Sequence, residues 1–152
     1  DKSKLRCKFD YLGYEFDIQS GKVKTKFTNS KFKKIKNRLF IAFDDFYNLS
    51  KVDKKLAKKL LIKRIRYLTG NTRLVNNKSK ILIGIFYSNR YLTEVGQLKS
   101  LDAKLKHLIR TKISTNSLKN KLNNYSFKEG FEQKRFSPFK STELKEIMRI
   151  WK

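Results

Sequence analysis

Apolar and charged side chains alternate along residues 14–27, and this alternation predicts a β-hairpin with its turn at residues 19–22. Pairing Ile18 with Val23 fixes the register of the two strands. The same register brings four more pairs opposite each other: Phe16 with Thr25, Tyr14 with Phe27, Asp17 with Lys24 and Glu15 with Lys26. Two pairs of opposite charge and one aromatic pair therefore agree on a single register. Residues 5–12 are expected to add a third strand or to lead into the hairpin.

After the hairpin, apolar residues recur every three or four positions, which is the spacing of amphipathic helices. Ser30 is predicted to cap a first helix that runs to about Asn48. Ser50, with Asp53 three residues later, is predicted to start a second helix that ends at Gly70. The two apolar stripes consist of Phe32, Ile35, Leu39, Ala42, Phe43 and Phe46, then Val52, Leu56, Leu60, Leu61, Ile65 and Leu68. Because the connection is so short, the two helices are expected to pack as neighbours.

The rest of the chain divides by pattern into six segments: a polar connector at 71–80, an apolar run at 81–87, helices at 93–112, 116–122 and 141–151, and an aromatic loop at 125–139. The apolar run is ambiguous, because its composition favours a strand whereas its neighbours favour a buried helix. The expected fold is mainly α with an α+β character. It places an antiparallel hairpin at residues 1–28 and a basic helical bundle at residues 29–152.

Composition supports a folded protein. The chain has 152 residues, of which 39% are hydrophobic and 13% aromatic, enough to build a core. Cys7 is the single cysteine, which excludes an internal disulfide and a cysteine-based zinc site and fits a reducing, cytoplasmic setting. The longest apolar run, 81–87, is too short to span a membrane. Because the chain begins at Asp1 rather than Met, we expect it to be part of a longer protein.

The net charge of +25, from 38 basic and 13 acidic residues, indicates a polyanionic partner. An AT-rich genome explains some of the lysine excess, but it does not explain the shortage of acids. No membrane span is present in the sequence, so the charge favours nucleic acid over a membrane as the partner.

Basic residues concentrate on the two predicted helices. On the second helix, Lys55, Lys59, Lys63 and Arg66 lie opposite the leucine stripe, and no acid follows Asp53 within the helix to pair with them. On the first helix, the cations occupy the N-terminal half, where the helix dipole disfavours them unless an anion binds nearby. The candidate nucleic-acid-binding residues are Lys33, Lys34, Lys36, Arg38, Lys55, Lys58, Lys59, Lys63, Arg64, Arg66 and Arg73. The alternative is a solvated lysine surface.

The segment Tyr11-Leu12-Gly13-Tyr14 with Phe16, directly before a basic helical region, resembles the primer-grip hairpin of bacterial reverse transcriptases of the group II intron, retron and antiphage-defence types. Residues 64–89 resemble the thumb region of the antiphage-defence enzymes. The resemblance implies that Tyr11, Leu12, Gly13, Tyr14 and Phe16 grip the primer and that the helices clamp a template–primer duplex, either RNA or an RNA–DNA hybrid. It also implies that Mg²⁺ and the catalytic carboxylates belong to the palm of the parent polymerase. The palm and fingers of the same polypeptide would then be partners of this chain. The alternative for Gly13 is an ordinary turn or β-bulge glycine.

Two other functions compete with the polymerase thumb. One is a stand-alone basic RNA- or DNA-binding module, for example a ribosome-associated one. The other is a small metal-dependent nuclease that uses the adjacent carboxylates Asp44 and Asp45. However, Asp45 is expected to face away from the apolar stripe, and His107 is expected at the surface. The sequence therefore predicts no catalytic residue, no metal site and no cofactor in this chain.

Overall fold

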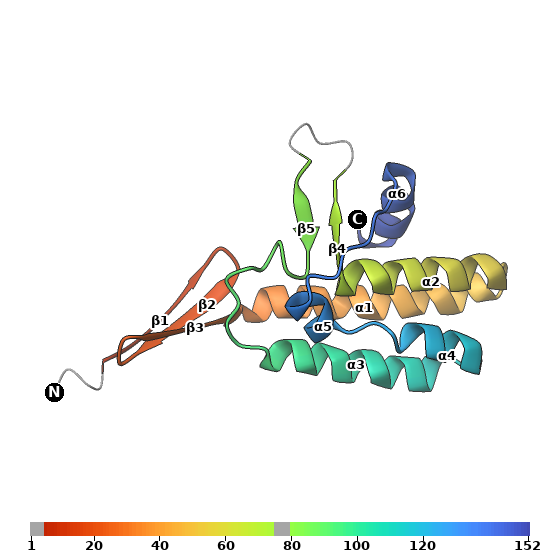
Figure 1. The fold of residues 1–152 in the computed structure, drawn as a ribbon. Helices are drawn as coiled ribbons and strands as arrows, with labels where there is room; N and C mark the ends of the chain where they lie inside the picture. Colours follow the sequence, from red (N-terminus) through yellow and green to blue (C-terminus); the bar gives the residue numbers. More distant parts are fainter. Residues whose placement is uncertain (1–4, 75–79) are drawn as a thin grey trace.

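Three antiparallel strands at the N-terminus project from one end of a helical body (Figure 1). The computed structural model describes residues 5–74 and 80–152. Its elements in chain order are β1 (Arg6–Tyr11), β2 (Tyr14–Gln19), β3 (Lys22–Phe27), α1 (Asn29–Ser50), α2 (Lys54–Thr69), β4 (Asn71–Arg73), β5 (Leu82–Gly84), α3 (Gly96–Lys112), α4 (Asn116–Leu122), α5 (Phe127–Glu132), α6 (Ser141–Met148) and the 3₁₀ helix η2 (Arg149–Trp151). This arrangement confirms the expected fold class.

The hairpin register predicted from the sequence is confirmed. Ile18 lies opposite Val23, and all four other expected pairs are present. The third strand is also confirmed, because β1 pairs with β2 along its whole length. Phe9 on β1 stacks on Phe16 on β2 with a ring distance of 5.1 Å, which supports the same pairing.

Helices α1 and α2 are antiparallel neighbours, as expected, but their predicted boundaries were wrong by a few residues. Thr28, not Ser30, caps α1, and its hydroxyl accepts a hydrogen bond from the backbone N–H of Lys31. Ser50 ends α1 instead of starting α2, and its hydroxyl donates to the carbonyl of Phe46. Asp53 is itself the cap of α2, because its carboxylate accepts from the N–H of Leu56 at 2.9 Å.

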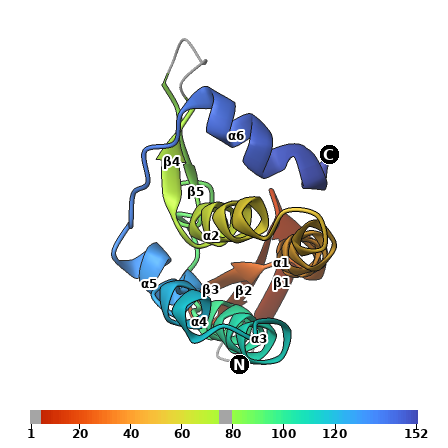
Figure 2. The same ribbon diagram turned by 90° about the vertical axis from the view of Figure 1, so that its right-hand side faces the viewer.

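The α1–α2 pair is covered on both sides (Figure 2). Helices α3, α4 and α5 cover one side, and α6 with η2 covers the other. The main core lies on the α3 side and includes Phe27, Leu39, Phe43, Leu61, Ile65, Leu98, Leu101, Leu105 and Phe127. No helix in the described part of the chain is long and apolar enough to cross a membrane.

The expected aromatic loop at 125–139 contains a short helix, α5, which the sequence analysis missed. The cause is a distant carboxylate: Asp102 on α3 accepts hydrogen bonds from the backbone N–H of Phe127 at 2.6 Å and from the hydroxyl of Ser126 at 2.8 Å. Ser126 is also the cap of α5. A half-buried acceptor on α3 therefore holds the first turn of α5. The local signal was Ser126 with Glu129 three residues later, a pattern typical of a helix start.

Buried Asn71 organises the region that was expected to be a polar connector. Its Oδ1 accepts from the backbone N–H of Phe86 at 2.9 Å and of Tyr87 at 3.3 Å. Its Nδ2 donates to the carbonyls of Gly130 at 3.3 Å and Arg135 at 3.0 Å. Residues 71–73 form β4, and 82–84 form β5, so the ambiguous run at 81–87 is a short strand followed by a turn. Residues 75–79 of the predicted connector lie outside the described residues.

The sheet is fastened to the start of α3 by side chains. The backbone N–H of Phe27 donates to Oε1 of Gln97 at 2.8 Å, and Nε2 of Gln97 donates back to the Phe27 carbonyl at 3.1 Å. The backbone N–H of Thr25 donates to the Thr93 hydroxyl at 2.8 Å. Because Thr93 serves this attachment, α3 begins at Gly96 instead of at residue 93. These bonds fix the sheet relative to the helical body.

Candidate nucleic-acid interface

A groove runs along the N-terminal half of α1 and consists of two adjoining hollows. The first, of about 510 Å³, lies between α1, the β1–β2 turn and the turn that follows β5. The second, of about 570 Å³, lies between α1 and the C-terminal Trp151. Ser30, Lys34 and Arg38 line both hollows, so the two lie side by side along α1. We call this feature the α1 groove.

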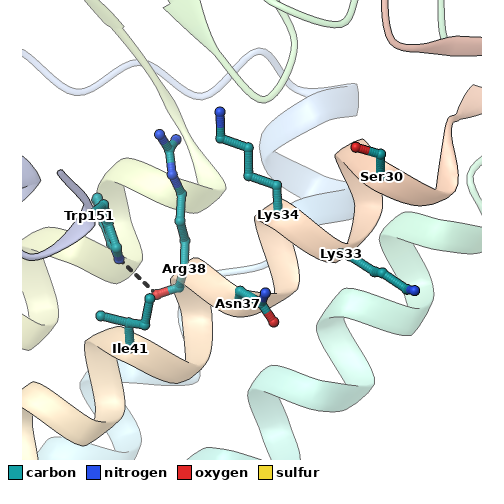
Figure 3. Close-up of a pocket in the computed structure, with 7 residues that line it drawn as sticks. All are labelled: Ser30, Lys33, Lys34, Asn37, Arg38, Ile41 and Trp151. Atoms are coloured by element: carbon teal, nitrogen blue, oxygen red, sulfur yellow. Dashed lines mark hydrogen bonds between the residues drawn. The ribbon is translucent and has the colours of Figure 1, made fainter.

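Two predicted phosphate-binding residues, Lys34 and Arg38, extend from α1 in the same direction (Figure 3). They are four residues apart and therefore stand on one face of the helix, with Ser30 one turn earlier. Lys33 extends in a different direction but also lines the second hollow. Lys36 lies over the ring of Phe32 and lines neither hollow. The α1 cations are therefore only partly gathered in the groove.

Lys31 is the residue that the sequence analysis missed. Its ammonium group lies over the rings of Tyr14, at 4.9 Å, and Phe27, at 5.4 Å. Among the described residues no carboxylate is within ion-pair distance of it, and burial lowers the pKa of its amine. The side chain lines the first hollow together with Lys34 and Arg38. The spacing of Lys31, Lys34 and Arg38, three and four residues, was a signal in the sequence that could have identified it.

The five candidate primer-grip residues do not lie on one surface. Leu12 and Gly13 form the two-residue turn between β1 and β2, with φ angles of 49° and 82°, and both line the α1 groove. Tyr11 is exposed, whereas Tyr14 is buried and Phe16 packs against Phe9 on the sheet. Gly13 is thus in a turn and does not lie within a strand.

The lysines of α2 form a separate cluster. Lys55, Lys58 and Lys59 are exposed on the N-terminal half of α2. Because α2 runs antiparallel to α1, this half lies beside the C-terminal half of α1 and away from the groove (Figure 1). The predicted basic surface is therefore divided in two. Arg73 is exposed on the short strand β4.

As expected, no acid within α2 pairs with the second-helix cations, but three of them have partners on other parts of the chain. Arg64 is fully buried and pairs with Asp45 at 2.5 Å, so it is not on the basic surface. Lys63 pairs with Glu143 of α6 at 2.7 Å. Arg66 donates from Nε to the hydroxyl of Ser137 at 2.8 Å. Their partners come from distant parts of the chain, which is why inspection of the helix alone missed them.

The carboxylates do not assemble a metal site among the described residues. Asp45, one of the two candidate nuclease ligands, is engaged with Arg64, while Asp44 is exposed. No group of three or more His, Cys, Asp or Glu side chains in the described part of the chain is arranged to hold a metal ion. His107 is exposed on α3, as expected, with Nδ1 at 3.4 Å from a guanidinium nitrogen of Arg110.

Comparisons of the chain with models of protein families, with curated proteins and with solved structures give no match. The α1 groove contains three cations, from Lys31, Lys34 and Arg38, and two serine hydroxyl groups, from Ser30 and Ser88. The rest of its lining is largely apolar. Such a groove is suited to hold an anion attached to an apolar or aromatic body. A strand of nucleic acid, with its phosphates, sugars and bases, fits that description.

Proposed function

We propose that this chain binds the phosphate backbone of nucleic acid through the α1 groove, as the thumb part of an RNA-directed DNA polymerase. The observation that carries the proposal is Lys31. Its half-buried ammonium group has no acidic partner among the described residues, and it stands beside Lys34 and Arg38. A cation that is partly removed from water without a counter-ion is costly to the fold, and a bound phosphate would supply that counter-ion.

The composition of the groove favours recognition of the backbone over recognition of base sequence. Two of its three central cations are lysines, which act as point charges and accept a phosphate from many directions. The apolar part of the groove lining includes Ile35, Leu68 and Ile83, whose side chains cannot distinguish bases by hydrogen bonding. A surface of this kind holds any strand and lets it slide, as a polymerase thumb requires.

The position of the groove supports a role at the primer. One end of the groove is formed by the Leu12-Gly13 turn, which is the part of the primer-grip-like segment that faces it. The carbonyl of Gly13 accepts from the backbone N–H of Thr28 at 3.0 Å, so the turn is tied directly to the start of α1. In the proposed thumb, this connection keeps the gripped strand and the clamped duplex in a fixed relation. The contribution to catalysis is orientation, and the Mg²⁺ chemistry belongs to the palm of the parent polymerase.

The test is a binding titration of the intact chain with a fluorescent RNA–DNA duplex at several salt concentrations. With five to eight phosphate contacts, the slope of log affinity against log salt should be about −4 to −7. A groove variant combining Lys31→Met, Lys34→Gln and Arg38→Gln should reduce the steepness of that slope by about 2 to 3.

The matched control removes the same number of positive charges from exposed positions on α3 and α4: Lys106→Gln, Lys112→Gln and Lys121→Gln. The control variant should lose duplex affinity only because the net positive charge of the protein is lower. Its slope of log affinity against log salt should stay close to that of the unaltered chain. Equal losses in the two triple variants would mean that the groove is no special site, and the proposal would fail.

A further inference from the structure

The C-terminal segment 137–151 lies across the face of α2 that carries the predicted row of cations (Figure 2). It packs through its own small apolar cluster, in which Phe139, Leu144 and Ile147 are buried and Tyr67 is the main contact from α2. The buried residues of this cluster are not part of the main core, but Tyr67 and Trp151 pack against both. Trp151 is also fixed to α1, because its Nε1 donates to the carbonyl of Arg38 at 2.9 Å. Residues 137–148 are therefore attached to α2 mainly through the small cluster, whereas the last residues belong to the main body.

Each of three α2 cations is held by an oxygen atom of this segment. The carboxylate of Glu143 is 2.7 Å from the amine of Lys63, the hydroxyl of Ser137 is 2.8 Å from Nε of Arg66, and Nε of Arg64 donates to the carbonyl of Ile147 at 3.3 Å. Oxygen acceptors facing a row of cations are what a nucleic-acid backbone also provides. The three oxygen atoms of the segment thus lie where the phosphate oxygens of a bound nucleic acid could lie.

The contacts with residues 137–151 do not satisfy every hydrogen-bond donor of Arg64. It is fully buried, and its Nη2 has no hydrogen-bond partner among the described residues. Asp45 supplies the single carboxylate that pairs with it. A buried guanidinium with an unsatisfied donor is unfavourable, so lifting the segment would return those N–H groups to water or to an anion.

Lys63 and Arg66 continue the line of the exposed lysines Lys55 and Lys59 at spacings of four, four and three residues. With the segment in place, that line is interrupted after Lys59. We propose that residues 137–148 cover a second phosphate-binding surface, formed by Lys63 and Arg66 on α2, and compete with a nucleic-acid duplex for it. This inference rests on the proposed function, because it assumes that the α1 groove brings a duplex to the molecule.

The Lys63–Glu143 ion pair allows a sharp test, because it can be broken from either side. Glu143→Gln frees Lys63 for phosphate, whereas Lys63→Gln removes the same ion pair together with the phosphate ligand. Beyond the effect of the changed net charge, a purely structural pair predicts the same effect on duplex affinity for both variants. Competition predicts opposite effects: Glu143→Gln should raise affinity about fivefold and steepen the salt slope by about 1, and Lys63→Gln should not raise it.

Glu146→Gln is the control for the loss of one negative charge, because Glu146 is exposed on the same helix and its side chain makes no ion pair or hydrogen bond with the residues that the structure describes. Competition is supported only if Glu143→Gln raises duplex affinity more than Glu146→Gln does. Hydrogen exchange of the unaltered chain gives a second readout. At saturating RNA–DNA duplex, the amides of 141–148 should exchange faster while those of α1 become protected.

The outcomes separate this inference from the proposed function. If the groove variant loses affinity but Glu143→Gln matches Glu146→Gln and the 141–148 amides do not exchange faster, the segment is a fixed part of the fold and the inference is wrong. If the groove variant binds as well as the unaltered chain, the proposed function itself is wrong, and the inference fails with it.

Discussion

The side chain of Lys31 packs against Gly13, with its Cδ 3.0 Å from the position that a Cβ on Gly13 would occupy. The β1–β2 turn and the first turn of α1 are therefore in direct contact. The absence of a side chain at Gly13 lets the Lys31 amine reach the faces of Tyr14 and Phe27. The turn that resembles a primer grip thus positions the most unusual cation of the α1 groove.

Gly13→Ala should weaken nucleic-acid binding through Lys31. A Cβ at this position is strained because φ is +82°, and it also crowds the lysine stem. Gly21→Ala is a matched control, since Gly21 has a φ of +76° but no atom within 4 Å of the added Cβ. Both changes should cost about 1 kcal/mol of unfolding free energy from the backbone. Only Gly13→Ala should also reduce duplex affinity, measured by fluorescence anisotropy under conditions where both variants are folded. Equal affinities in the two variants would show that the turn does not control Lys31.

Lys31→Met should stabilise the protein at neutral pH and weaken duplex binding. Methionine keeps an apolar stem on the two rings and removes the partly desolvated charge. Its effect on binding should appear as a salt slope shallower by about 0.9, the loss of one phosphate contact. Urea unfolding and a salt titration measure the two effects. A variant that is less stable than the original at neutral pH would contradict this account of the Lys31 environment.

The difference in unfolding free energy between Lys31→Met and the unaltered protein should also depend on pH. Burial lowers the pKa of Lys31 below its usual 10.5 in the folded state, so the folded protein releases this proton before the unfolded chain does. The unaltered protein therefore becomes more stable relative to Lys31→Met as pH rises from the lowered pKa toward 10.5. Urea unfolding of both proteins between neutral pH and pH 10.5 measures the difference, which should shrink over that range. A constant difference would mean that the Lys31 amine is not desolvated.

The hairpin was predictable from the sequence because everything that sets its register is local. Tyr14 and Phe27 are 13 residues apart in the sequence, and the alternation of side chains together with two charge pairs selects one alignment. The short helix at 116–122 was predictable for the same reason, and its bounds are confirmed. Helix ends were less accurate, because Thr28 and Ser30, or Ser50 and Asp53, are all acceptable caps by residue type alone.

The partners of Arg64 and Asn71 could not have been identified from the sequence. On a helical wheel Arg64 falls within the apolar stripe of α2, four residues from both Leu60 and Leu68, which indicates a buried position. Its partners, the Asp45 carboxylate and the Ile147 carbonyl, nevertheless come from α1 and α6. Asn71 is part of a polar stretch typical of a connector, but its side chain binds two segments that arrive from residues 86–87 and 130–135. In both cases distant segments supply the partners, and local periodicity carries no record of them.

Asp45→Ala should destabilise the protein by about 3 kcal/mol, because it leaves the guanidinium of buried Arg64 without its carboxylate. The neighbouring Asp44→Ala is the natural control: Asp44 is exposed, and its change should stay within about 0.5 kcal/mol. Urea unfolding monitored by circular dichroism measures both. The pair of variants also addresses the nuclease alternative. Mg²⁺-dependent cleavage of nucleic acid that disappears in both variants would identify these aspartates as metal ligands and contradict a purely structural role for Asp45.

The separation of the two basic clusters should make binding depend on duplex length. From the helical rise of 1.5 Å per residue, Lys34 in the α1 groove and Lys58 on α2 differ by about 17 Å along the α1–α2 axis, equivalent to about five base pairs. A hairpin duplex of about 4 base pairs should therefore reach the groove alone, whereas a duplex of about 14 should reach both clusters.

Changing Lys55, Lys58 and Lys59 together to Gln tests this geometry. The triple variant should bind the short duplex almost normally, because the α1 groove is unchanged. It should bind the long duplex more weakly, with a salt slope shallower by about 2 to 3, because the distant contacts are lost. A titration of both duplexes with both proteins measures the effect. If the triple variant lost the same fraction of affinity for short and long duplexes, the lysines of α2 would act only through the general field of the protein. Binding would then be confined to the α1 groove, and α2 would contribute no separate surface for the clamped duplex.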